Sequence, residues 1–225
     1  MPIAKYWDQV TVDQVKKAYE FCGYPFFTKG DYNVNLFAIR TNENIANTFN
    51  DIIGLCYKVS GEWRLFKTDA TANDPGLYYR HNPMDRRGAA ILIPGYYKSF
   101  FCIGPHGKTK YTALRQKESS PGRYWRDNDR DDTLDRKGKV YVEVAYTNLH
   151  RATGIDGNTS KLVDKFSAGC AVIASKDKWD TFLEIMQKSR EIYGNSFSYA
   201  LFNEESFFCR KKEDYEKIIY QGKEI

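Results

Sequence analysis

The sequence predicts a mainly β protein with peripheral helices, an α+β class, on three observations. Most apolar residues fall in short alternating or continuous runs bounded by Gly, Pro, Asn and Ser, as in strands joined by turns. Apolar residues at helical spacing occur in only a few segments. Finally, 42% of the 225 residues are apolar and 16% are aromatic, which supplies a sizeable core and excludes a disordered chain.

Helical periodicity and boundary residues predict the helices. Thr11 and Gln14 have the form of a capping box before an apolar stripe that stops at Gly23. Ser175 is placed to cap a second amphipathic helix, which ends before Gly194. The predicted helical segments are 11–22, 43–53, 175–193 and 215–220.

Alternating or continuous apolar runs predict the strands. Ser60 and Gly61 provide one hairpin turn, and residues 104–107 provide another. The run that follows Gly169 is nearly all small or apolar, which is typical of a central strand. The predicted strands are 53–59, 62–68, 89–93, 97–103, 108–115, 139–149, 169–174 and 197–202, of which 139–149 is the longest.

The chain shows no repeat, no Ser/Gly/Pro-rich linker and no low-complexity tract, so we expect one compact unit. Within it, residues 1–50 are predicted to form an N-terminal helical element that packs on a main domain comprising residues 51–225.

The charge balance is mild, because 34 basic and 29 acidic side chains give a net charge of +5. The positive residues are dispersed rather than arranged in a stripe, so nucleic-acid binding is not expected. No apolar run is long enough for a membrane helix, and the N-terminus has no secretory h-region. We therefore expect no membrane span and synthesis in the cytoplasm without a signal peptide. The oligomeric state is left open.

The five cysteines are scattered and none forms a C-x-x-C pair, so neither a disulfide framework nor a zinc ribbon is predicted. His81 and His106 also lack Cys or Glu at ligand spacing, so no metal site is expected from them and no cofactor is required.

One cysteine, Cys170, stands apart because it follows Ser167, Ala168 and Gly169, and because His150 ends the longest predicted strand. A nearby imidazole can lower the pKa of a thiol and later donate a proton to a leaving group. If the two strands are neighbours, these side chains can meet. Small residues before Cys170 let a substrate carbonyl approach the backbone amides, which can serve as an oxyanion site. The alternative is an ordinary buried thiol.

This arrangement resembles the L,D-transpeptidase (YkuD-type) catalytic domain, whose signature is a His, a spacer and then Ser/Thr-His-Gly-Cys. Residues 151–166 form the spacer here. The resemblance implies a YkuD-like β-sandwich catalytic domain and acyl transfer on the stem peptides of peptidoglycan. The implied roles are Cys170 as nucleophile, His150 as base and the backbone near Gly169 as the oxyanion site, and Ser167 is counted with Gly169 among the catalytic residues. We also predict Arg151 and Tyr146 as substrate-binding residues.

Three residues depart from the family pattern: Ala168 replaces the second His, Val172 replaces a polar residue, and Arg151 replaces a small one. Loss of polar acceptor-side residues favours water over an amine as the acceptor, so hydrolysis is expected rather than cross-linking. A wall enzyme without a signal peptide resembles phage lysis or tail-associated proteins, which act at the bacterial cell wall or travel in a virion. The alternative is a catalytically inactive phage structural or cell-wall-binding module that retains the fold.

A second candidate site is the acidic loop 127–135. Asp127, Asp129, Asp131 and Asp135 have the spacing of calcium ligands, but the central Gly and the final Glu of an EF-hand are absent. We interpret this loop as a solvated acidic turn, with calcium binding as the alternative.

Overall fold

The computed structural model describes residues 6–44 and 47–211, and strands dominate it. One set of strands comprises β1 (Asn35–Arg40), β2 (Asp51–Val59), β3 (Glu62–Thr71), β5 (Gly95–His106), β6 (Tyr111–Gln116), β9 (Leu149–Arg151), β10 (Ala171–Ile173) and β11 (Phe197–Asn203). These strands form a closed barrel in the order β1-β11-β5-β6-β9-β10-β3-β2. The barrel is a more closed arrangement than the two-sheet sandwich that the family resemblance implies.

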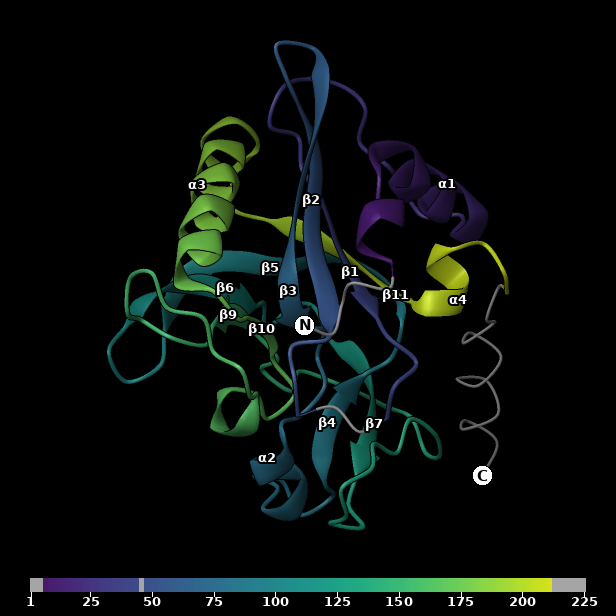
Figure 1. Ribbon diagram of the computed structural model, residues 1–225, viewed down its shortest axis with the longest axis vertical. Coiled ribbons are helices and arrows are strands. Elements are labelled where there is room, and N and C mark those ends of the chain that lie inside the picture. Colours follow the sequence, from purple (N-terminus) through teal and green to yellow (C-terminus); the bar gives the residue numbers. More distant parts are fainter. Residues whose placement is uncertain (1–5, 45–46, 212–225) are drawn as a thin grey trace.

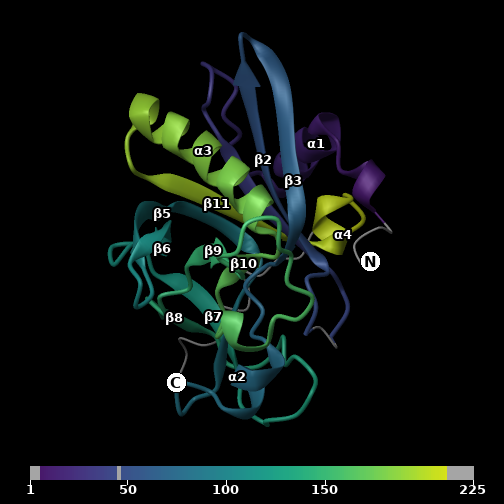
Figure 2. The ribbon, with the colours of Figure 1, turned by 60° about the vertical axis from the view of Figure 1, so that its left-hand side comes forward.

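A separate three-stranded sheet has the order β4-β7-β8 and comprises β4 (Ala89–Leu92), β7 (Gly122–Asp127) and β8 (Tyr141–Glu143). Figures 1 and 2 both place β4 and β7 on the side of the barrel opposite to the free end of the long β2–β3 hairpin.

Helices lie around the strands, which confirms the predicted mainly β class with peripheral helices (Figure 1). The helical segments are η2 (Trp7–Gln9), α1 (Val12–Cys22), α2 (Leu77–His81), η3 (Asp164–Phe166), α3 (Lys176–Tyr193) and α4 (Glu204–Phe207). Among the described residues, no helix combines the length and the apolar character needed to cross a bilayer.

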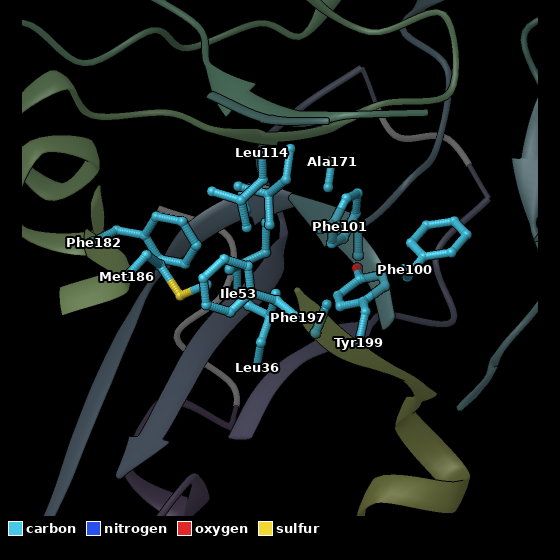
Figure 3. Close-up of a cluster of buried hydrophobic side chains, with 14 of the residues drawn as sticks. Leu36, Ile53, Phe100, Phe101, Leu114, Ala171, Phe182, Met186, Phe197 and Tyr199 are labelled. Atoms are coloured by element: carbon cyan, nitrogen blue, oxygen red, sulfur yellow. The ribbon is translucent and has the colours of Figure 1, made fainter. Parts of the chain in front are cut away.

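The main core fills the barrel and extends to the apolar face of α3. Figure 3 shows Phe182 and Met186 of α3 pointing toward Ile53, Leu36 and Phe197 of the barrel strands. Burial of this large apolar surface is the dominant favourable contribution to folding. The helix therefore covers a part of the barrel that would otherwise expose its interior.

A second core lies outside the barrel, where α1 and α4 cover β1, β2 and β11. Thr11 caps α1 by accepting a hydrogen bond from the amide of Gln14 at 3.2 Å, and Gly23 ends it with a left-handed φ of 72°. This confirms the predicted helix 11–22. The predicted boundary at residue 50 falls between β1 and β2, which pair with each other, so residues on both sides of it belong to one barrel.

The predicted helix over 43–53 is wrong. Residues from Asp51 onward form β2, and the preceding described residues form a loop. Asparagine side chains in this loop bond outside it: Asn47 Oδ1 accepts from the amides of Leu77 and Asp164 at 3.0 and 2.8 Å. Such bonds compete with helix formation, and barrel pairing of Ile52 and Ile53 decides the strand.

The predicted single strand over 139–149 is also wrong, because the chain forms β8, leaves the small sheet and joins the barrel as β9. Between them Tyr146 has a positive φ of 53°, which an extended strand does not allow. The side chain of Gln116 accepts a hydrogen bond from the amide of Thr147 at 3.1 Å and so replaces a ladder partner. The predicted helical turn over 215–220 lies outside the described residues.

Candidate functional site

Parallel pairing of β9 with β10 brings the predicted site residues to one face. Val172 lies beside His150, and the same register places Cys170 beside Asn148. Alternate residues of a strand share a face, so these four side chains form a block in which Cys170 is diagonal to His150. Leu149 and Ala171 point into the barrel core, so the block lies on the outer face of the barrel.

The loop before Cys170 is held by Ser167, which is fully buried. The Ser167 hydroxyl lies 2.8 Å from the carbonyl oxygens of Asp74 and Cys170, and it accepts a hydrogen bond from the Gly169 amide at 3.1 Å. Gly169 has a φ of +121°, and a Cβ there would lie 2.5 Å from the carbonyl oxygen of Ala90. Only glycine fits both conditions.

The thiol of Cys170 is protonated at rest. Burial raises the pKa of Cys170 to about 11, although the Asn148 amide, which donates to Sγ at 3.3 Å, favours the thiolate. The carbonyl oxygen of Tyr146 lies 4.0 Å from Sγ. Among the described residues, no hydrogen bond joins Sγ to an imidazole, so the resting site holds no preformed thiolate–imidazolium pair.

His150 is held as a neutral base. Its Nδ1 lies 2.9 Å from the carbonyl oxygen of Arg151, and a carbonyl only accepts, so Nδ1 carries the proton and Nε2 keeps its lone pair. Burial, then the charge of His106, lowers the pKa of His150 to about 4. The ring is therefore neutral at pH 7 in one defined tautomer, as a general base requires.

His106, at the end of β5, joins the site, although its sequence context gives no sign of this. Its ring stacks on His150 with centroids 4.5 Å apart and an interplanar angle of 22°. Asn148 Nδ2 donates to His106 Nδ1 at 3.2 Å, because Asn148 Oδ1 is already fixed by the Gln116 amide at 2.9 Å. His106 Nδ1 therefore accepts, and in the neutral ring the proton lies on Nε2. No local motif signals this position, because only the β5–β6–β9 pairing brings it here.

A cleft of about 460 Å³ opens beside the thiol. Cys170, His106, Asn148, Ala168 and Tyr146 line it from the barrel side. The opposite wall belongs to the small sheet and the loop before it, and it is charged. Its ion pairs join Arg87 to Asp85 at 2.6 Å, Arg87 to Glu143 at 2.9 Å, and Arg126 to Glu143.

Only some of the six predicted site residues line the cleft. Cys170 and Tyr146 line the cleft, whereas His150 lies behind the stacked ring of His106, which does line it. Arg151 is directed elsewhere, with its guanidinium 4.4 Å from the ring centroid of Tyr111. Ser167 and Gly169 lie beneath the loop and shape it.

The backbone amides expected to bind an oxyanion differ in availability. The Gly169 amide is engaged by Ser167 Oγ, whereas the Cys170 amide donates to no acceptor within residues 6–44 and 47–211. One amide beside the thiol is thus free to stabilise developing negative charge.

No protein-family model matches the chain, and no curated protein or solved structure gives a significant match to it. The functional conclusion therefore rests on the residues of this site and on their geometry.

Proposed function

We propose that the protein is a cysteine-dependent acyl-transfer enzyme that acts on peptidoglycan stem peptides, and that its barrel is a divergent form of the L,D-transpeptidase (YkuD-type) catalytic domain. The observation that carries the proposal is a thiol in a cleft beside two stacked histidines, one of which is held neutral with a free Nε2. A nucleophile, a base and a group that orients the base are the parts that acyl transfer needs.

The reaction begins with two neutral groups. As Sγ of Cys170 attacks the carbonyl carbon of a stem-peptide bond, its proton passes to Nε2 of His150. Because His150 does not line the cleft, this step requires that substrate binding rotates the thiol toward His150 and moves the stacked ring of His106 aside. The Cys170 amide donates to the oxyanion, and the His150 imidazolium returns its proton to the departing amine. An acyl-thioester remains on Cys170.

Water then resolves the thioester, so the proposed outcome is hydrolysis rather than cross-linking. The neutral imidazole of His150 removes a proton from the attacking water, and the thiol is restored with release of a carboxylic acid. Ala168 offers no polar group to hold an acceptor amine, and Val172 is buried in an apolar cluster. The charged wall formed by Arg87, Asp85 and Glu143 suits a short peptide that carries both carboxylate and amine groups.

The proposed place of action is the bacterial cell wall, which a phage protein reaches at lysis or as part of a virion. No membrane span or nucleic-acid partner is part of this proposal, and no metal or cofactor takes part in the chemistry.

Digestion of purified sacculi tests the proposal. Wild-type protein is expected to change the muropeptide profile, and Cys170→Ala is expected to slow the change at least ~10³-fold because the covalent route is lost. Cys102→Ala, which removes a half-buried cysteine of β5, is the matched control and should retain activity. A profile that wild type leaves unchanged, or that Cys170→Ala changes equally, contradicts the proposal.

Two observations favour a second candidate, a wall-binding module without catalysis. Among the described residues Sγ makes no hydrogen bond to an imidazole, and burial raises the pKa of Cys170. The same sacculi distinguish the two functions. A non-catalytic module would sediment with sacculi in wild-type and Cys170→Ala forms alike and leave the muropeptides intact.

A further inference from the structure

The acidic loop that follows β7 brings three carboxylates together. One oxygen from each of Asp127, Asp129 and Asp135 can be chosen so that all three lie within 4.8 Å of one another. The fourth predicted ligand, Asp131, is used differently, because it accepts hydrogen bonds from the Thr133 amide and hydroxyl at 2.6 and 2.7 Å. Asp129 also accepts a hydrogen bond from the Asp131 amide at 3.3 Å, so it belongs both to the turn and to the cluster, whereas Asp131 lies outside the cluster.

The burial of Asp127 is a second feature that points to a bound cation. Its side chain is fully buried, and within residues 6–44 and 47–211 neither carboxylate oxygen has a hydrogen-bond partner. A buried carboxylate without partners is costly, so such groups are paired or coordinate metals in stable proteins. Asp129 and Asp135 add further negative charge beside it. The group therefore lacks sufficient positive charge around it.

One cation of the chain lies nearby but does not satisfy Asp127. Arg80 is 1% exposed and close enough to interact electrostatically with Asp127, yet it forms no ion pair with it among the described residues. A terminal nitrogen of Arg80 donates to the carbonyl oxygen of Asp132, and its Nε has no partner. Among the described residues, Arg80 therefore makes no direct contact that would satisfy the Asp127 carboxylate.

The surrounding packing holds the cluster in place. Asp127 ends β7 and pairs with Ala89 of β4. Leu134 is buried with Ile91 and Trp125 in an apolar cluster, and this anchors the neighbouring Asp135 above the end of β7. The end of the loop is therefore held against β7 by a buried apolar contact.

We propose that Asp127, Asp129 and Asp135 bind a calcium ion. Carboxylate oxygens are the ligands that hard divalent cations prefer, and Ca²⁺ holds its ligands at about 2.3–2.6 Å. Oxygens on opposite sides of such an ion lie up to about 5 Å apart, which accommodates the separation within the cluster. Water completes the coordination sphere. The ion supplies the charge that buried Asp127 lacks and links residues 128–135 to β7.

The site is structural and does not depend on the proposed enzyme activity. Arg126, which precedes Asp127, lines the cleft beside Cys170, so the ion stabilises one wall of the cleft without touching the reacting groups. Binding can therefore be measured on protein that has no activity at all.

Calcium titration of the EGTA-treated full-length chain tests the site. At CaCl₂ concentrations about a hundredfold above Kd, the melting temperature of wild type should rise by roughly 5–10 °C. Asp127→Asn and Asp135→Asn should lower the affinity at least tenfold in isothermal titration calorimetry. Asp131→Asn is the matched control, because it removes an equal charge from the same loop, and it should retain wild-type affinity.

A second readout does not depend on stability. Tb³⁺ bound at the cluster should luminesce on excitation of Trp125, two residues from Asp127, and added CaCl₂ should quench the signal by displacement. Absence of both calorimetric heat and a melting shift with CaCl₂ would overturn the site. An equal loss of affinity in Asp131→Asn would do the same, because it would show unspecific attraction to the acidic loop.

Discussion

At the scale of single residues, the site combines two reactive groups that are both neutral at rest. Burial disfavours the charged form of each, so it raises the pKa of Cys170 to about 11 and lowers that of His150 to about 4. The ion pair that activates many catalytic cysteines is thus absent before substrate binds. The thiol must therefore lose its proton as it attacks the substrate. The mechanism requires the His150 tautomer that the Arg151 carbonyl selects, because in that tautomer Nε2 can accept the proton.

The low pKa of His150 can be measured directly by NMR. Its ring should remain neutral down to about pH 4, and His106→Gln should raise the pKa because it removes a nearby positive charge. His81→Gln is the control. The ring of His81 is exposed and pairs with Asp132, so its loss should leave the titration of His150 unchanged. A His150 that titrates near its ordinary value of about 6.5 would contradict the burial of the base.

The same pKa gives the direction of a stability change. The neutral form is favoured in the folded state, so this contribution is fully present above about pH 6.5 and is lost as the pH falls toward 4. The acid limb of kcat/KM should likewise lie near pH 4, because only the neutral ring accepts the thiol proton.

At the scale of elements, the turn between η3 and β10 determines where the thiol points. The Ser167 hydroxyl connects this turn to the carbonyl of Asp74, and Asn73 Nδ2 donates to the carbonyl of Gly169 at 3.0 Å. The loop after β3 therefore supports the loop before β10, and the position of Cys170 depends on both.

Gly169→Ala tests how closely this turn is packed. The new Cβ would lie 2.5 Å from the Ala90 carbonyl oxygen at a φ of +121°, so we expect a loss of ~2–4 kcal/mol in the free energy of unfolding. Gly157→Ala also has a positive φ, but it has open space around it, and it should cost only ~1 kcal/mol. Urea denaturation measures both, and equal losses would show that the contact with Ala90 is unimportant.

At the scale of the whole molecule, a buried ion-pair network joins the barrel to the small sheet. Arg40 of β1 is 1% exposed, pairs with Asp74 at 3.1 Å, and donates to the carbonyl of Leu92 in β4 at 2.8 Å. Arg136, which directly follows the acidic loop 127–135, also pairs with Asp74 at 2.8 Å. The barrel and the small sheet are therefore held together by Arg40 and Asp74, whose side chains are at most 2% exposed.

Arg40→Met should destabilise the protein by ~3–5 kcal/mol, because Asp74 would lose its fully buried partner and Leu92 its donor. Arg64→Met breaks an exposed pair with Glu62 and should change the free energy of unfolding by less than ~1 kcal/mol. Equilibrium urea unfolding compares the two variants. A small effect of Arg40→Met would mean that the network does not hold the two sheets together.

Much of the local structure could be predicted from the sequence. The helix caps at Thr11 and Ser175 and the left-handed glycine at Gly23 were readable, because each depends on a few neighbouring residues. Strands β1 and β7 were not predicted, and a helix was expected where Ile52 and Ile53 enter β2. In those segments the partners across the barrel decide the conformation, and the partners are distant in the chain.

For the site, the sequence by itself determined the candidate thiol, the candidate base and the acidic loop, because residue type and spacing are local properties. Only the tertiary structure decided that His106 stacks on His150 and that Asn148 contacts both His106 and the thiol. It also decided that Asp127 is buried with no hydrogen-bond partner in the described part of the chain. The physical reason is that protonation and charge depend on burial and on neighbours brought together by strand pairing, which no window of sequence contains.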